Sequence, residues 1–256
     1  MNDTPTLLVD QKSEVLRLTL NRPEKSNALS IPLLDQIRKT LESFREKEIK
    51  CVVITGAGKK CFSAGGDLNE LNKIRSKEET ILMSECGHSA LNAIRYFPVP
   101  VIAAINGVAL GGGAELAMAC DIRIAAVNAD FGLIQSKLNV TTAWGGGIDL
   151  INTVGNSAAL VMLCSGQRLT AMDAREHKIY EQVCLDKEDF MLFTDKFLKE
   201  LCNAEITVLR AYKATAAKYR KNLQIALKET SQEGFVKSWL NPKHWEEAEK
   251  FLKKNK

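Results

Sequence analysis

Histidine is scarce in this chain. Its 256 residues include only three histidines, His88, His177 and His244, and these are far apart in the sequence. Histidine is the commonest metal ligand and the usual proton carrier near neutral pH. The scarcity argues against a histidine-rich metal site and against a mechanism that needs several imidazoles, and we expect no bound metal.

Closely paired cysteines are also lacking. The number of cysteines is odd, and no two stand at Cys-x-x-Cys spacing; the seven are Cys51, Cys61, Cys86, Cys120, Cys164, Cys184 and Cys202. Disulfide frameworks typically use an even number of cysteines in short secreted chains. We therefore expect reduced thiols and a cytoplasmic protein.

Long apolar runs and a strong excess of charge are absent as well. The most apolar stretch, residues 101–110, is about half the length of a membrane span. The start, MNDTPTLLVD, lacks the basic and apolar regions of a secretory signal. Basic residues number 35 and acidic residues 31, a net charge of +4. Nucleic-acid binding usually needs a concentrated basic face, so we expect neither nucleic acid nor membrane as a partner.

Short apolar runs alternate with helical patterns over the first 187 residues. Residues 5–20 favour a β-hairpin, and Ser30 with Pro32 favours the start of a helix. Residues 51–55, 101–105 and 122–126 predict buried strands, each followed by a glycine-rich turn and a helical pattern. This alternation predicts an α/β fold with a mostly parallel sheet.

The remaining residues, 188–256, predict helices only. Apolar residues recur at helical spacing in residues 190–201, and two further helical runs are expected at 204–227 and 228–254. The predicted organisation is an α/β core, residues 1–187, and a helical C-terminal region, residues 188–256. We expect that region to pack on the core or on a neighbouring subunit.

Three glycine-rich turns are candidate ligand sites, at residues 62–67, 107–115 and 143–147. They do not complete the dinucleotide or P-loop fingerprints, and no Gly-x-Ser-x-Gly motif occurs. The second turn joins a buried strand to a helix, so its N–H groups and the positive end of the helix dipole suit an oxyanion. Alternatively, the glycines only permit close packing and Glu115 is an ordinary acidic residue of a first helical turn.

The chain resembles the crotonase (enoyl-CoA hydratase/isomerase) superfamily along nearly its whole length. The matching segments occur in the family's order and spacing: Leu20-Asn-Arg-Pro23, Asn27-Ala-Leu29, Phe62-Ser-Ala-Gly-Gly-Asp67, Pro100-Val-Ile-Ala-Ala-Ile-Asn-Gly107, Leu110-Gly-Gly-Gly-Ala-Glu-Leu-Ala117, Cys120-Asp121, Phe131-Gly132 and Leu163-Cys-Ser-Gly166. The resemblance implies a spiral of ββα units with a helical C-terminal region that forms a homotrimer, or a hexamer made of two trimers.

The resemblance also implies the ligand and the residues that bind it. The partner would be an acyl-CoA or acyl-carrier-protein thioester, with no cofactor beyond the CoA of the substrate. By motif position, the backbone N–H groups of Gly66 and Gly112 would hold the thioester oxygen, where negative charge develops when an enolate forms. The CoA portion would be bound by Lys25, Ala28, Ala64, Gly65, Asp67 and Leu68.

One position separates the possible reactions. The resemblance implies that hydratases of this family use two glutamates in catalysis. Glu115 occupies the first of these positions, but the second position is Gln135. An amide neither takes nor gives a proton in the usable pH range. This counts against hydration, and against isomerisation too, because family isomerases rely on the second position.

The surroundings of Trp144, the segment Ala119–Arg123 and the segment Trp239–Lys250 resemble ethylmalonyl-CoA and methylmalonyl-CoA decarboxylases. Neutral Gln135 and apolar Trp144 would tolerate a substrate carboxylate, which a second glutamate would repel. The predicted activity is decarboxylation of a short malonyl-type thioester, with Glu115, or a water that it holds, returning a proton to the α-carbon. The alternatives are a hydratase or isomerase with Glu115 as its only acid/base, and a CoA-binding paralogue without activity. Trp144 could also be only a core aromatic.

Overall fold

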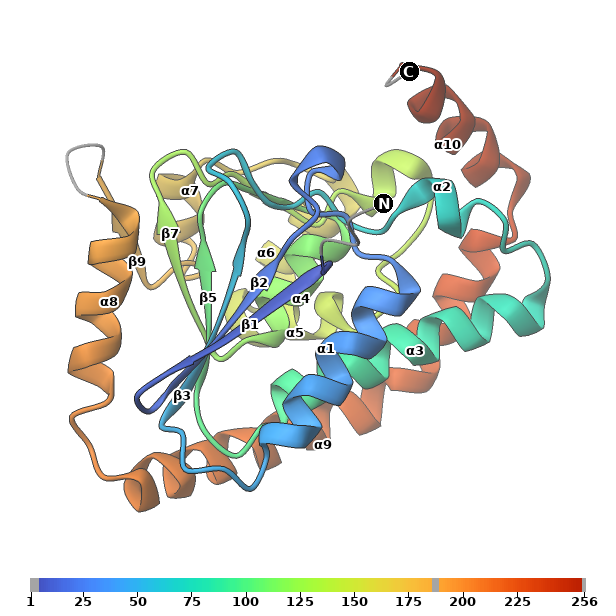
Figure 1. Ribbon diagram of the computed structural model, residues 1–256. Coiled ribbons are helices and arrows are strands. Elements are labelled where there is room, and N and C mark those ends of the chain that lie inside the picture. Colours follow the sequence, from blue (N-terminus) through green and yellow to red (C-terminus); the bar gives the residue numbers. More distant parts are fainter. Residues whose placement is uncertain (1–4, 186–188, 255–256) are drawn as a thin grey trace.

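The computed structural model describes residues 5–185 and 189–254. Its larger sheet has six strands in the order β1-β2-β3-β5-β7-β9 (Figure 1). β1 pairs antiparallel with β2, and every other neighbouring pair is parallel. The strand bounds are β1 Leu7–Lys12, β2 Val15–Leu20, β3 Cys51–Gly56, β5 Val101–Ile105, β7 Ile122–Ala126 and β9 Gln182–Cys184.

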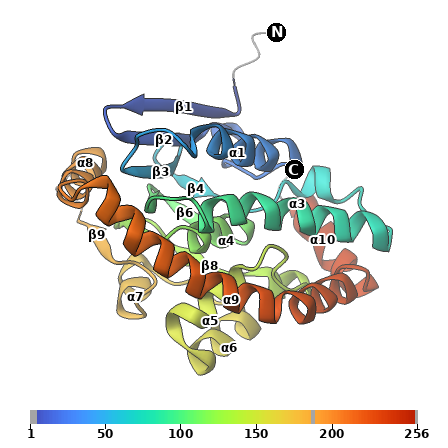
Figure 2. The same ribbon diagram turned by 90° about the horizontal axis from the view of Figure 1, so that it is seen from below.

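A second, parallel sheet contains three short strands in the order β4-β6-β8. These are β4 Cys61–Ser63, β6 Val108–Leu110 and β8 Phe131–Gly132. Each follows a strand of the large sheet after a tight turn and leads to a helical segment, so the chain repeats a ββα unit and the α/β spiral is confirmed. In the second view, β4, β6 and β8 follow one another on the side of β2 that faces away from β1 (Figure 2).

The central strands are buried on both faces, as parallel strands between helical layers must be. One face of β3 and β5, with Val52, Ile54 and Ala103, belongs to the main core, together with residues of α1 (Ile31–Phe44) and α3 (Lys77–Arg95). The opposite face, with Val53 and Ile102, packs against α8 (Phe190–Leu201). Figure 1 shows α8 covering that side of the sheet.

The expected start of the first long helix is confirmed. Ser30 is the N-cap of α1, and its side-chain oxygen accepts a hydrogen bond from the backbone N–H of Leu33 at 3.3 Å. Pro32 stands in the first turn, where its missing N–H costs nothing. The other elements are η1 Pro23–Lys25, α2 Leu68–Leu71, α4 Gly112–Ala119, η2 Gln135–Leu138, α5 Gly146–Val154, α6 Asn156–Ser165 and α7 Ala171–Glu176.

The C-terminal helices differ from the prediction. Residues 206–239 form one continuous helix, α9 (Ile206–Trp239), so the expected boundary at residues 227/228 is wrong; α10 (Pro242–Lys254) follows. The middle of α9 buries polar side chains, Lys213 and Gln224, so its buried face does not show as an apolar stripe. The predicted boundary between core and helical region, 187/188, lies outside the described residues.

No helix in the described ranges is both long enough and apolar enough to cross a bilayer. A single chain cannot test association, so the homotrimer or hexamer stays a prediction.

Candidate active site

One cavity of about 560 Å³ brings together all of the predicted site residues. It lies where the turns after β4 and β6 meet η2, α9 and α10. The residues named from the sequence that line it are Lys25, Ala28, Ala64, Gly65, Gly66, Asp67, Leu68, Gly112, Glu115, Gln135 and Trp144. Two segments that are far apart in the sequence, the first turn at residues 62–67 and the region around Trp144, therefore face the same space.

Two backbone N–H groups converge at one end of this cavity. Gly66 N lies 3.2 Å from the point that a Cβ atom on Gly112 would occupy. Neither N–H has an acceptor within the part of the chain that the structure describes. The preceding residues, Gly65 with φ +114° and Gly111 with φ +54°, adopt backbone conformations that L side chains rarely take. These two glycines let the chain turn so that the next N–H groups remain free, which suits a thioester oxygen.

Glu115 lies in the first turn of α4 and is 1% exposed, and each of its carboxylate oxygens accepts two hydrogen bonds. Its Oε1 accepts hydrogen bonds from Gln135 Nε2 at 2.9 Å and from Ala143 N at 3.1 Å. Its Oε2 accepts from Trp144 N at 2.8 Å and from Gly146 N at 3.0 Å. The carboxylate thus holds the turn 143–146 at the N-terminus of α5, where the helix dipole favours a negative charge.

The protonation of Glu115 depends on opposing effects. Burial raises the pKa of its carboxyl, while the hydrogen bonds from Gly146, Trp144 and Ala143 lower the pKa in part. A carboxylate offers about four acceptor positions, and four donors occupy them. Glu115 therefore holds no water in this arrangement, which changes the role expected for it from the sequence.

Gln135 begins η2 and presents its amide to both Glu115 and the cavity. Its NH₂ group donates to Glu115, which leaves its buried Oε1 without a partner among the described residues. The amide oxygen can accept a hydrogen bond but cannot take up a proton. Gln135 can therefore hold a water but cannot act as its base.

Trp144 is 3% exposed and its indole ring lies beside the two free N–H groups. A Cβ on Gly112 would lie 2.9 Å from Cη2 of the ring, and one on Gly66 would lie 3.8 Å from the same atom. Trp144 belongs to the main core and also lines the cavity. The two interpretations left open by the sequence, core aromatic and site residue, thus both describe it.

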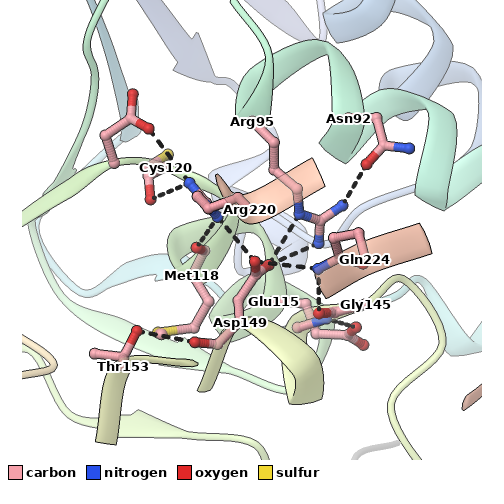
Figure 3. Close-up of polar contacts among 12 residues, drawn as sticks. Asn92, Arg95, Glu115, Met118, Cys120, Gly145, Asp149, Thr153, Arg220 and Gln224 are labelled. Atoms are coloured by element: carbon pink, nitrogen blue, oxygen red, sulfur yellow. Dashed lines mark hydrogen bonds and ion pairs between the residues drawn. The ribbon is translucent and has the colours of Figure 1, made fainter. Parts of the chain in front are cut away.

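A buried ionic network holds the turn of Trp144 from the other side (Figure 3). Arg95 of α3 donates from Nη2 to the carbonyl oxygen of Trp144 at 2.8 Å and from Nε and Nη2 to Asp149 Oδ2 at 3.0 and 2.8 Å. Gln224 Nε2 donates to the Gly145 carbonyl at 3.2 Å, and Arg220 Nη2 to Asp149 Oδ1 at 2.9 Å.

This network sets the charge of Asp149. Burial alone would raise the pKa of Asp149, but Arg95 and Arg220 outweigh it and lower the pKa. The polar residues of α9 thus attach the C-terminal region to the site. Sequence reasoning missed this role, because polar residues in a long helix usually indicate a solvated face.

The residues expected to bind CoA lie on either side of Gly66 in the same turn and in the segment 25–28, and all of them line the cavity. Asp67, 6% exposed, pairs with Arg22 at 2.8 Å, and Lys25 Nζ lies 3.9 Å from the same carboxylate oxygen. Burial would raise the pKa of Asp67, but the hydrogen bond from Arg22 helps lower it overall. Lys25 is about half exposed, so its ammonium group is accessible to an anion.

The C-terminal region supplies lining residues that the sequence did not identify as part of the site. Phe235 and Trp239 of α9 and His244 of α10 line the cavity with Met83 of α3. His244 contacts the Leu138 carbonyl oxygen through Nδ1 at 2.6 Å, and its ring packs against that of Trp239 with the centroids 4.7 Å apart. The aromatic residues clustered at 235–245 are the sequence feature that could have indicated these lining residues.

The fold and cavity are those of one enzyme family. The family model described as enoyl-CoA hydratase/isomerase matches residues 10–256. The chain belongs to this family, the crotonase superfamily, and is an enzyme of that type.

Its similarity to individual proteins is moderate. It is 35% identical to "Probable enoyl-CoA hydratase, mitochondrial" of Dictyostelium discoideum over 86% of this chain and 78% of the relative. It is 39% identical to the 2,3-dehydroadipyl-CoA hydratase of Escherichia coli K12 over 69% and 68%. A crystal structure of an enoyl-CoA hydratase from Mycobacterium avium subsp. paratuberculosis matches with a TM-score of 0.85 at 27% identity, covering 97% and 99%. These names favour hydration over decarboxylation and leave the predicted decarboxylase likeness without support.

Proposed function

We propose that this protein is an acyl-CoA lyase that decarboxylates a short malonyl-type thioester, such as ethylmalonyl-CoA or methylmalonyl-CoA. The observation that carries the proposal is the complete engagement of Glu115 beside a neutral Gln135. The site combines two free N–H donors with a carboxylate that has no acceptor position left for water.

Decarboxylation needs an oxyanion hole more than it needs a base. When the bond between the α-carbon and the carboxylate breaks, its electron pair moves toward the thioester oxygen and carbon dioxide leaves. The N–H groups of Gly66 and Gly112 would stabilise the enolate where its charge develops. Hydration, in contrast, requires a group that removes a proton from water, and the acceptor positions of Glu115 are already occupied by four described donors.

The surroundings also suit a substrate that brings its own carboxylate. Gln135 is neutral, so it does not repel the anion as a second glutamate would. Trp144 would desolvate the carboxylate, and a poorly solvated carboxylate gains from becoming neutral carbon dioxide.

The enolate must then take up a proton at its α-carbon. We assign the proton to a water held by Oε1 of Gln135, the buried acceptor that lacks a partner within the described part of the chain. The water gives one proton to carbon, and the remaining hydroxide combines with carbon dioxide to form hydrogencarbonate. In this scheme Glu115 positions the turn 143–146 and does not transfer the proton.

The exposed ammonium group of Lys25 and the turn around Gly66 suit a thioester with a long anionic carrier. We assign Lys25 to the CoA phosphates, and Ala28, Ala64, Gly65, Asp67 and Leu68 to the loop around the adenine. A phosphopantetheine group on a carrier protein shares the same thioester arm, so an acyl-carrier-protein substrate remains part of the proposal. We expect a homotrimer or hexamer in the cytoplasm.

Hydration is the second candidate, because the relatives named above are hydratases. For hydration, Glu115 would have to lose at least one of its hydrogen bonds from backbone N–H groups and act as the only acid/base of the site. Isomerisation would require the same change. A third possibility is a protein that binds CoA thioesters without converting them.

The test is to incubate the protein with ethylmalonyl-CoA, methylmalonyl-CoA and crotonyl-CoA and to follow the products by mass spectrometry. Loss of carbon dioxide from a malonyl-type thioester supports the proposal. Addition of water to crotonyl-CoA without decarboxylation supports hydration, and binding without conversion supports the third candidate. Gln135→Glu is the diagnostic variant, since it should suppress decarboxylation, and Gln135→Asn is its neutral control.

A further inference from the structure

We infer that the indole ring of Trp144, seated against Gly87 of α3, is the wall that limits the length of the acyl chain. The inference rests on the proposed function to the extent that an acyl thioester places its oxygen at Gly66 and Gly112. It concerns which acyl groups fit, and so can be tested separately from the reaction.

The ring spans the gap between the oxyanion donors and helix α3. On one side, a Cβ on Gly112 would lie 2.9 Å from Cη2 and would overlap with Cζ3. On the other side, a Cβ on Gly87 would overlap with Cδ1, Nε1 and Cγ of the same ring. The indole therefore fills the space directly behind the position of the thioester oxygen.

The contact with Trp144, and not the backbone conformation, explains why residue 87 is a glycine. It lies inside α3, where glycine is unfavourable relative to alanine. Its φ is not positive, so the backbone there does not require glycine. The need that remains is space, and the atoms that occupy the space are those of Trp144.

The wall is fixed as well as close. The backbone N–H of Trp144 donates to Glu115 Oε2 at 2.8 Å, and its carbonyl oxygen accepts from Arg95 Nη2 at 2.8 Å. Arg95 is wholly buried and paired with Asp149, so it cannot be released without leaving a buried charge unpaired. The next carbonyl, of Gly145, accepts from Gln224. These contacts fix the backbone from which the ring projects, and close packing against Gly87 and Gly112 holds the ring itself in place.

The rest of the lining near the ring is apolar and bulky, with Leu71, Met83, Val140 and Phe235. We expect an acyl chain that runs from the thioester carbon toward α3 to meet the indole first. Short chains, such as acetyl and butyryl, should then fit in front of the ring, whereas a chain of six to eight carbons should have to displace it. Trp144 is thus a specificity-determining residue for a short acyl group.

The test measures binding of saturated acyl-CoA thioesters, which carry no carboxylate to lose and no double bond to hydrate. Acetyl-, butyryl-, hexanoyl- and octanoyl-CoA are titrated calorimetrically into wild type, Trp144→Ala and Trp144→Phe, with free CoA as control. Wild type should bind octanoyl-CoA at least about tenfold more weakly than butyryl-CoA, since a single methylene in a hydrophobic pocket is worth about tenfold or more. Trp144→Ala should remove this difference while the affinity for free CoA stays the same.

Trp144→Phe guards against a variant that fails to fold, because it keeps an aromatic ring in the same seat and should move the length limit by one or two carbons. Equal affinity of wild type for butyryl- and octanoyl-CoA, or an identical length profile in wild type and Trp144→Phe, would overturn the inference. If the profile shifts but no malonyl-type thioester is decarboxylated, the wall stands and the proposed reaction fails. If a malonyl-type thioester is decarboxylated but the variants do not change the length profile, the reaction stands and the wall fails. Failure of the wild type to bind any acyl-CoA contradicts both the wall and the proposed reaction.

Discussion

Replacing Glu115 by glutamine keeps the size of the side chain but removes its charge and one acceptor oxygen. The new amide oxygen can face Trp144 N and Gly146 N, which keeps both hydrogen bonds to the start of α5. The new NH₂ group then faces Gln135, whose own amide can turn so that its free Oε1 accepts. The backbone N–H of Ala143 loses its acceptor, and the NH₂ group of Gln135 exchanges its bond to Oε1 of Glu115 for the open cavity.

The expected cost of Glu115→Gln follows mainly from the loss at Ala143, because the NH₂ group of Gln135 can contact water in the cavity. Leaving one buried N–H without an acceptor costs about 1–3 kcal/mol. For a chain of this size, such a change lowers the midpoint of thermal unfolding by about 2–4 °C per kcal/mol. Because the turn and the oxyanion donors stay in place, we expect carbon dioxide release to continue within about tenfold of the wild-type rate. In this variant the turned NH₂ group of Gln135, in place of its Oε1, would hold the water that gives a proton to the enolate.

Glu115→Asp is the matched control, since it keeps the charge but shortens the reach to the turn 143–146. It should be less stable and less active than Glu115→Gln, although it retains a carboxylate. Activity is followed as release of carbon dioxide from ethylmalonyl-CoA and stability by thermal unfolding. A general acid or base typically contributes about 10²–10⁴-fold. A loss of that size in a stable Glu115→Gln would refute the positioning role and return Glu115 to proton transfer.

Three further predictions concern stability. Gly87→Ala should destabilise the protein by about 1–3 kcal/mol through overpacking, and Trp144→Leu should cancel most of that loss; additive effects in chemical denaturation would contradict the contact. Asp149→Asn should cost about 3–5 kcal/mol, because it leaves buried arginines without their counter-charge. Because the pKa of Asp149 is lowered in the folded state, its charge stabilises the wild type fully at pH values above 3.8, the ordinary pKa of the group. This contribution is lost as the pH falls through the folded-state pKa. If Asp149→Asn loses stability with acid as the wild type does, this explanation is refuted. Burial lowers the pKa of His88 from 6.5 to about 4, so the unfolded state binds the extra proton and stability should fall by up to about 3 kcal/mol between pH 6.5 and 4. Unfolding of His88→Gln should lack that slope, and an unchanged slope would show that other groups cause it.

The sequence predicted the parts of the site that depend on local chain geometry. The turns 62–67 and 107–115 follow buried strands, and the glycines in them indicate close approach of a backbone, so Gly66, Gly112 and Glu115 could be named in advance. In a parallel sheet, turns at the same end of successive strands lie near one another. That explains why residues from distant segments meet at one cavity.

Contacts between elements could not be predicted in the same way. Gly87 stands in an ordinary helical pattern, and nothing nearby indicates that its missing side chain makes room for Trp144. The buried face of α9 consists partly of Lys213, Arg220 and Gln224, so hydrophobic periodicity did not detect it. The four hydrogen bonds to Glu115 involve three backbone N–H groups, which leave no trace in residue types.

The most direct test of the central claim uses ethylmalonyl-CoA carrying an isotopic label in its free carboxylate. The account predicts that the purified protein releases the label as carbon dioxide or hydrogencarbonate and leaves butyryl-CoA. Retention of the label, together with conversion of crotonyl-CoA to a hydroxyacyl-CoA by the same preparation, would contradict it.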